Sequence, residues 1–175
     1  MPRAYAGVWV RVLAFALDYL VIALYLVLLT AFGLALNSVF PGGLPALFGN
    51  PLTGQLTGFL VVTLPVTLYF ALFESSAWQA TWGKRQQHLQ VIGPQGERLS
   101  RMRALSRTAL KFVPWELAHT CVWQLSRNAH VPSSVVTAGF VLVWILVGAN
   151  LVSLLIRPTH QTLYDRLAGT YVVRI

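Results

Sequence analysis

The sequence predicts an all-α membrane protein: a four-helix transmembrane bundle with a small cytoplasmic β-hairpin or three-stranded sheet and a short C-terminal amphipathic helix. Two observations carry this prediction. Of the 175 residues, 56% are hydrophobic and only 10% are charged, which is too little polar material to cover a soluble globule of this size. Several apolar runs also reach the roughly 20 residues that a membrane span requires. We expect one integral membrane domain, residues 1–175.

Four segments are candidate spans: 8–36, 58–78, 104–125 and 134–156. The first run is longer than the roughly 7 to 15 apolar residues of a signal peptide. It also contains Asp18, which a cleaved leader has no reason to carry. We therefore expect a permanent span there. Pro65 predicts a kink in the second span, where a neighbouring helix can satisfy the carbonyl that the proline leaves free.

Basic residues predict the orientation of the spans. Residues 37–57 contain no charged side chain, whereas the loop 79–103 is rich in lysine and arginine. By the positive-inside rule, 37–57 lies outside and 79–103 lies in the cytoplasm, together with the N-terminus and the tail 157–175. The basic residues of the loop are Lys84, Arg85, Arg98, Arg101 and Arg103. These features are typical of a multi-pass membrane protein with both termini in the cytoplasm.

The third segment is the least apolar of the four. Its ionisable residues are Arg107, Lys111, Glu116 and His119. If the segment only lay on the cytoplasmic surface, the last helix would carry Arg157, Arg166 and Arg174 to the outside. Four crossings avoid this and leave only Arg127 in an external loop. A re-entrant or steeply tilted third helix is the alternative.

The cytoplasmic segments have predicted structure of their own. Residues 88–92 and 97–100 alternate roughly between apolar and polar side chains around a Gly-Pro-Gln-Gly turn, which is typical of a hairpin. Residues 170–175 resemble a third strand, and because a lone hairpin is marginal in water, we expect them to pair with it. Leu163 and Leu167 predict a short amphipathic helix at the inner surface, ended by Gly169.

Ionisable residues inside spans are candidate functional residues, because their burial is costly. Arg11 and Asp18 lie on nearly one helical face but about 10 Å apart along the axis, so we expect no direct ion pair between them. Asp18 needs another partner, for which Arg107 and Lys111 lie at a suitable depth. Asp18 then either clamps two helices or binds a proton or an ion, and the sequence leaves both open.

Other function classes find little support. The net charge of +8 does not indicate nucleic-acid binding, because the basic residues flank apolar segments and no reading motif accompanies them. A single cysteine, Cys121, excludes an internal disulfide and a cysteine metal cluster. Glu116 and His119 have the three-residue spacing of metal ligands in helical bundles, but one copy without bridging carboxylates favours a polar contact. No catalytic set or nucleotide motif is present, so we expect neither an enzyme nor a cofactor or metal.

Three groups of residues resemble a known family. They are Arg11 ahead of Asp18 in the first span, Glu74-Ser75 followed by Thr81-Trp82-Gly83-Lys84-Arg85, and Leu163-Tyr164-Asp165-Arg166-Leu167-Ala168-Gly169-Thr170. Together they resemble the RDD family of bacterial membrane proteins. That family is named for one arginine and two aspartates, which map to Arg11, Asp18 and Asp165. The resemblance implies a multi-span inner-membrane protein, with transport, including cation/proton exchange, suggested for some members. Asp165 is also expected to tie the tail to the loop by pairing with Lys84, Arg85 or Arg107.

The predicted function is transport coupled to a cation or a proton through the membrane-embedded Asp18. The charge network expected to serve it comprises Arg11, Asp18, Asp165, Arg107, Lys111, Glu116 and His119. The alternative is a non-catalytic scaffold or subunit of a larger membrane complex. As partners we expect the lipid bilayer, anionic lipids at the basic loop 79–103, a monovalent cation or proton, and further copies of the chain or a larger complex, but no nucleic acid.

Overall fold

The computed structural model describes residues 4–42, 47–127 and 132–175. Its long helices are α1 (Val8–Val39), α6 (Arg101–Arg127) and α7 (Ser133–Ile156). A further helix consists of α3 (Pro51–Gly58), the π-helical turn η1 (Phe59–Thr63) and α4 (Leu64–Glu74). The short elements are α5 (Trp82–Gln86), β1 (Leu89–Ile92), α8 (Leu163–Leu167) and β2 (Tyr171–Arg174). The protein is thus mostly helical, with one small sheet.

Three helices of the described residues have the length and composition of membrane spans: Val8–Val39, Pro51–Glu74 and Ser133–Ile156. Large apolar side chains on these helices are exposed, as Leu24, Leu60 and Leu155 illustrate. Such surfaces suit contact with lipid. The fourth predicted span corresponds to α6, which is long enough to cross but is too polar to belong to this apolar set.

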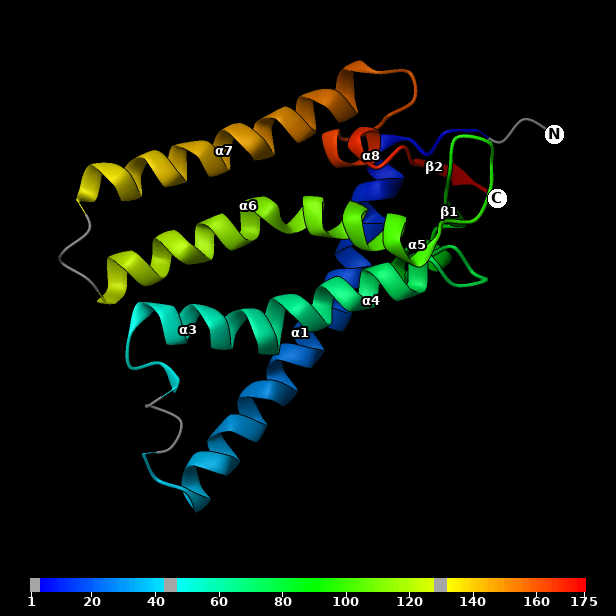
Figure 1. Cartoon of the computed structure of the whole chain (residues 1–175). Coiled ribbons are helices and arrows are strands. Elements are labelled where there is room, and N and C mark those ends of the chain that lie inside the picture. The colour runs from blue at the N-terminus through cyan, green and yellow to red at the C-terminus, as the bar shows by residue number, and fades with distance from the viewer. Residues whose placement is uncertain (1–3, 43–46, 128–131) are drawn as a thin grey trace.

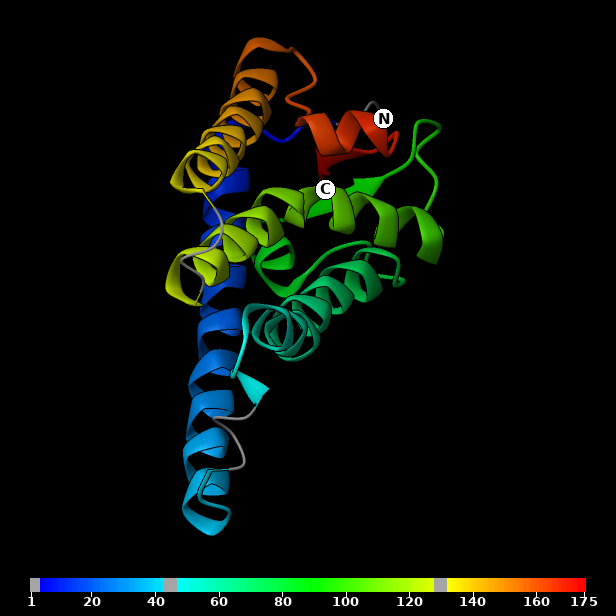
Figure 2. The same ribbon diagram turned by 60° about the vertical axis from the view of Figure 1, so that its left-hand side comes forward.

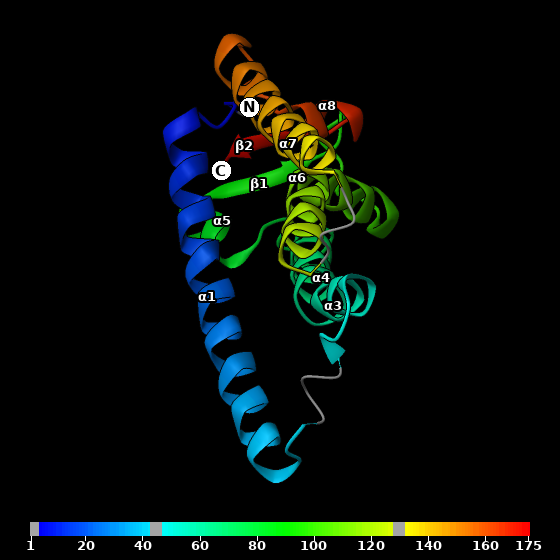
Figure 3. The ribbon, with the colours of Figure 1, turned by 90° about the vertical axis from the view of Figure 1, so that its left-hand side faces the viewer.

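The helices converge at the end of the molecule that holds β1, β2, α5 and α8, which we call the sheet end. Figures 1 and 3 show α6 between α4 and α7, with α1 on the other side of the sheet. Figure 2 shows that the far half of α1 extends away from the other helices. Both ends of the described chain lie at the sheet end (Figure 1), which brings segments from the start, middle and end of the sequence together.

The second span is shifted relative to the predicted 58–78, because its helix begins at Pro51 and ends at Glu74. The earlier start follows from Asn50, whose side chain accepts the Thr53 N–H at 3.0 Å and caps the helix. Pro65 lacks an N–H and so frees the carbonyl of Val61 four residues earlier. The Tyr25 hydroxyl on α1 donates to that carbonyl at 2.5 Å, as a neighbouring helix was expected to do.

The sheet has two strands rather than three. β1 and β2 are antiparallel, with Leu89 opposite Arg174 and Ile92 opposite Tyr171, so the predicted pairing of the C-terminal strand is confirmed. Residues 97–100 contribute only one bridge, between Arg98 and Ile92. They fail to form a strand because Ser100 already accepts the Arg103 N–H and begins α6.

The free side of β2 is covered by the N-terminal segment. The Ala6 N–H donates to the Val172 carbonyl, and the Arg174 N–H donates to the Ala4 carbonyl, both at 2.9 Å. Ala6, Leu89 and Val172 are fully buried and belong to the main apolar core. The two ends of the chain are therefore held together by backbone hydrogen bonds.

The predicted C-terminal helix is present as α8, but an acidic side chain rather than Leu167 faces the interior of the protein. Its acidic residue, Asp165, is completely buried, whereas Leu167 is 74% exposed. The aspartate side chain faces inward because its hydrogen-bond donors Arg11 and Arg107 lie on α1 and α6. The leucine is left at the surface of the sheet end.

Candidate functional site: a buried charge network beside a cavity

Asp165 is the centre of the network. Arg11 on α1 donates to Oδ2, and Arg107 on α6 donates to Oδ1 through Nε at 2.9 Å and Nη2 at 2.6 Å. Thr162 and Asp165 cap α8 reciprocally, each backbone N–H donating to the other side chain at 3.3 Å. One carboxylate thus joins α1, α6 and α8. Of the partners predicted for Asp165, Arg107 is confirmed.

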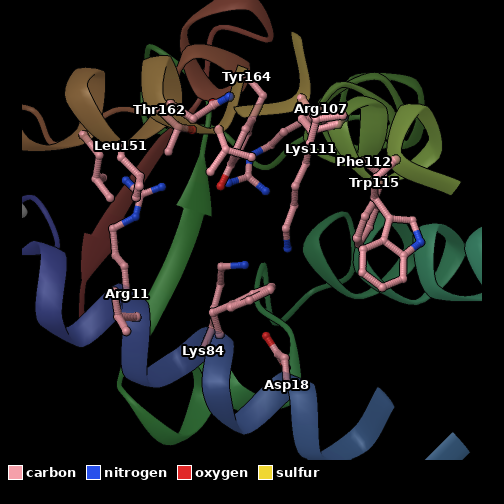
Figure 4. Close-up of a pocket in the computed structure, with 18 of the residues that line it drawn as sticks. Arg11, Asp18, Lys84, Arg107, Lys111, Phe112, Trp115, Leu151, Thr162 and Tyr164 are labelled. Carbon is pink, nitrogen blue, oxygen red and sulfur yellow. The ribbon is translucent and has the colours of Figure 1, made fainter. Parts of the chain in front are cut away.

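Arg107 extends the network to the end of α4. Its Nη1 donates to Glu74 Oε2 at 2.6 Å, and Lys84 Nζ pairs with Glu74 Oε1 at 2.6 Å. Arg107, Glu74 and Asp165 are all essentially inaccessible to solvent. Such burial is tolerated because each carboxylate is paired and hydrogen-bonded. Figure 4 shows Arg11 extending from α1 and Arg107 from α6.

The network shifts the ionisation of the α8 residues. Burial raises the pKa of the Asp165 carboxyl, but Arg107 and Arg11 outweigh burial and hold the pKa well below its usual range. Burial and the nearby Asp165 charge raise the pKa of the Tyr164 hydroxyl. Asp165 is therefore an anion, and Tyr164 a neutral hydroxyl, at neutral pH.

This shift predicts an acid-dependent loss of stability. The pKa of Asp165 is lower in the folded than in the unfolded protein, so its contribution is complete above about pH 4 and is lost as the pH falls further. Unfolding in detergent should show a free energy that decreases below about pH 4, with a smaller decrease in Asp165→Asn. Identical pH profiles for the two proteins would refute the shift.

Asp18 is held by neutral donors. Its Oδ1 accepts the Tyr69 hydroxyl at 2.9 Å and the Gly83 N–H at 2.8 Å, and its Oδ2 accepts the Thr81 hydroxyl at 2.6 Å. The expected ion pair with Arg107 or Lys111 is wrong: neither cation lies within 4.0 Å of Asp18 in the described chain. The physical reason is that α5, not α6, packs against this face of α1. Asp18, although it lies on α1, therefore caps the N-terminal end of α5.

Gly83 allows this close approach. A Cβ atom at position 83 would lie 2.1 Å from the Ala14 carbonyl oxygen and 2.9 Å from Asp18 Cγ. Only glycine permits α5 to lie this close to α1 while its N–H reaches the carboxylate.

Glu116 and His119 form a separate cluster. Gln55 donates to Glu116 at 2.8 Å, Thr63 donates to its other oxygen, and His119 Nδ1 lies 3.7 Å away. Glu116 is nine residues beyond Arg107 on α6, about 13 Å along the helix axis. Within the described residues, no group of three or more His, Cys, Asp or Glu side chains is arranged to hold a metal ion.

A cavity of about 440 Å³ lies beside the network, lined by α1, α6, α7 and α8. Its walls are largely apolar, and its ionisable residues are Arg11, Asp18, Lys84, Arg107, Lys111 and Tyr164. Figure 4 shows Lys111 and Asp18 pointing into the same space from α6 and α1. The Lys111 ammonium lies 3.3 Å from the Phe70 ring centroid and 4.8 Å from that of Phe15.

The structure therefore brings together five of the seven residues selected from the sequence and leaves Glu116 and His119 apart. Sequence reasoning missed the roles of Glu74, Lys84 and the donors to Asp18. Glu74 was noted only as part of a resemblance, and Lys84 was considered as a partner of Asp165 rather than of Glu74. The available signal was that Glu74 ends an apolar span, where an acidic residue requires a cationic partner.

Comparison with known proteins gives a consistent result. The model of the RDD family matches residues 5–169, which include the whole network. An uncharacterized protein of Bacillus subtilis (strain 168), YxaI, is 30% identical over 116 residues, covering 58% of this chain and 72% of its own. No solved structure matches the chain. Since the family match extends over nearly the whole length, the chain is a member of the RDD family of membrane proteins.

Proposed function

We propose that this chain is a small transporter of the bacterial plasma membrane, coupled to a proton or a monovalent cation at Asp18. The supporting observation is the cavity of about 440 Å³, into which ionisable side chains from α1, α5 and α6 point. Ionisable groups are costly at membrane depth, and where they line a cavity they mark solute or proton pathways.

Four crossings, with α6 as the fourth, fit this function. Residues 4–6 bond to β2, which supports placing these two segments on one side of the membrane and an even number of crossings between them. Three apolar spans then require one more, and α6 runs beside α4 and α7. The basic loop at the sheet end makes that side cytoplasmic, where it also attracts anionic lipids.

Coupling rests on the charges that share the cavity. Asp18 and Lys111 both line it, and no ion pair joins them. A solute that changes the charge near Lys111 alters the field at Asp18, because charges in a poorly solvated wall interact strongly. Asp18 then takes up or releases a proton or a monovalent cation as the solute binds and leaves.

Flux in proteoliposomes tests the proposal. Proton movement driven by sodium, potassium or lithium gradients should be present in the parent protein and absent from Asp18→Asn. Glu97→Gln is the matched control, because Glu97 pairs with Arg103 at the exposed surface outside the cavity. Equal flux in the parent and Asp18→Asn would remove Asp18 from the coupling step.

A membrane scaffold or subunit is the second candidate. It is favoured by the three donors that Asp18 already has and by the complete pairing of Asp165 and Glu74, as in a structural clamp. A well-folded parent protein without flux supports this candidate.

Because four helices offer little room for alternating access, a transporter of this size is expected to work as a homo-oligomer, which cross-linking in membranes would detect.

A further inference from the structure

Lys111 differs from the other cations of the cavity. Arg11 and Arg107 pair with Asp165, and Lys84 pairs with Glu74. All five acidic residues of the chain are described, and none of them lies within 4.0 Å of the Lys111 ammonium. The cavity therefore has one amine that forms no ion pair with a carboxylate of the described residues.

Aromatic rings hold the Lys111 ammonium in place. Besides Phe70 and Phe15, the ring of Phe112 lies 5.3 Å from it, centroid to nitrogen. Aromatic faces attract a cation but leave its net charge unchanged. An amine that is held in a largely apolar wall without an ion-pair partner is complementary to an anionic group of a ligand, which would stabilise its protonated form.

The rest of the cavity is suited to hydrocarbon. Its apolar lining includes Val12 and Phe15 from α1, Trp115 from α6, and Val147, Leu151 and Leu154 from α7. The volume of about 440 Å³ lies within the range of about 300 to 1,000 Å³ that is typical of small-molecule pockets. A mainly apolar wall with one placed charge fits a long chain that carries a single charged head.

We propose that the cavity binds a single-chain anionic amphiphile, such as a long-chain fatty acid, with its carboxylate on Lys111 and its chain along α6 and α7. This inference rests on the proposed function in one respect, because it names the substrate class of the transporter. The bound anion adds a negative charge beside Asp18 and so favours a proton or a monovalent cation there. The amphiphile and the coupling ion thus bind together.

Photo-crosslinking tests the site without requiring transport. The purified protein, in nanodiscs of phosphatidylcholine, is labelled with a palmitate analogue that carries a diazirine in mid-chain. We expect saturable labelling of α7 between Val143 and Leu154 that palmitate competes away. Lys111→Met keeps the length of the side chain and removes its charge, so it should weaken competition by palmitate about tenfold, the equivalent of one lost ion pair. Labelling with a diazirine analogue of hexadecanol, which has no charge, should be unchanged in this variant.

Two control variants separate charge from shape. Arg166→Met removes a positive charge at an exposed position outside the cavity and should leave labelling as in the parent. Val147→Trp fills the apolar wall and should abolish labelling by both probes. Labelling by the palmitate analogue that is not saturable, or competition by palmitate that is as strong in Lys111→Met as in the parent, overturns the proposal. If labelling follows these expectations and flux is absent, the ligand site stands and the transport function fails.

Discussion

Arg107→Met is expected to lower the free energy of unfolding by roughly 3 to 5 kcal/mol, the usual effect of removing one partner from a buried ion pair. Arg107 is 1% exposed and lies between Asp165 and Glu74, with a 2.6 Å contact to each. Without it, Glu74 keeps only Lys84, and Asp165 keeps only Arg11 as a cationic partner. Reversible unfolding in detergent, followed by circular dichroism, measures the change.

Arg103 provides the matched control on the same helix. It pairs with Glu97 at 2.8 Å, but both side chains are 42% exposed. Arg103→Met should therefore change the free energy of unfolding by less than about 1 kcal/mol. Arg107→Lys should fall between the two, since lysine keeps the charge but cannot bind two carboxylates through a planar fork. Equal effects at positions 103 and 107 would show that Arg107 is not the centre of a buried network.

Gly83→Ala is expected to destabilise the contact between α5 and α1 by about 1 to 3 kcal/mol, the usual cost of overpacking. The added methyl group would lie 2.1 Å from the Ala14 carbonyl oxygen, which is backbone and cannot swing aside. α5 must then move away from α1, and its N–H loses Asp18. Because Asp18 lines the cavity, flux should decrease together with stability.

Gly148→Ala is the matched control for Gly83→Ala. No atom lies within 4 Å of a Cβ built at this position of α7, so alanine fits without strain. Its effect should be neutral or slightly stabilising, because alanine favours a helix more than glycine does. If Gly83→Ala is equally well tolerated, the close packing of α5 on α1 is not needed.

The apolar spans were predictable because their signal is local. A run such as Val8–Val39 reveals its environment by composition alone. The C-terminal strand was predictable for a similar reason, because Tyr171–Arg174 alternates and a short sheet needs a partner. The pairing of Asp165 with Arg107 followed from the cost of leaving a charge unpaired.

The remaining features depend on residues distant in sequence. Asp18 finds its donors on α4 and before α5, more than 50 residues away, and no periodicity within the first span indicates this. The contact of the N-terminal segment with β2 was not predicted, because residues 4–6 have no strand pattern of their own. α6 is too polar for a hydropathy criterion, and its charges are neutralised only once α4 and α8 pack against it.

Cysteine accessibility tests the four-crossing architecture most directly. Single cysteines are introduced as Ser38→Cys, Gln95→Cys and Ile175→Cys into a Cys121→Ser protein, since these three positions are exposed and Cys121 is the only native cysteine. A membrane-impermeant thiol reagent is applied to intact spheroplasts and then to lysed ones. We expect labelling of position 38 from outside, and of positions 95 and 175 only after lysis. Labelling of positions 95 and 175 from opposite sides would mean that α6 does not cross and that the sheet does not join the two segments in the membrane.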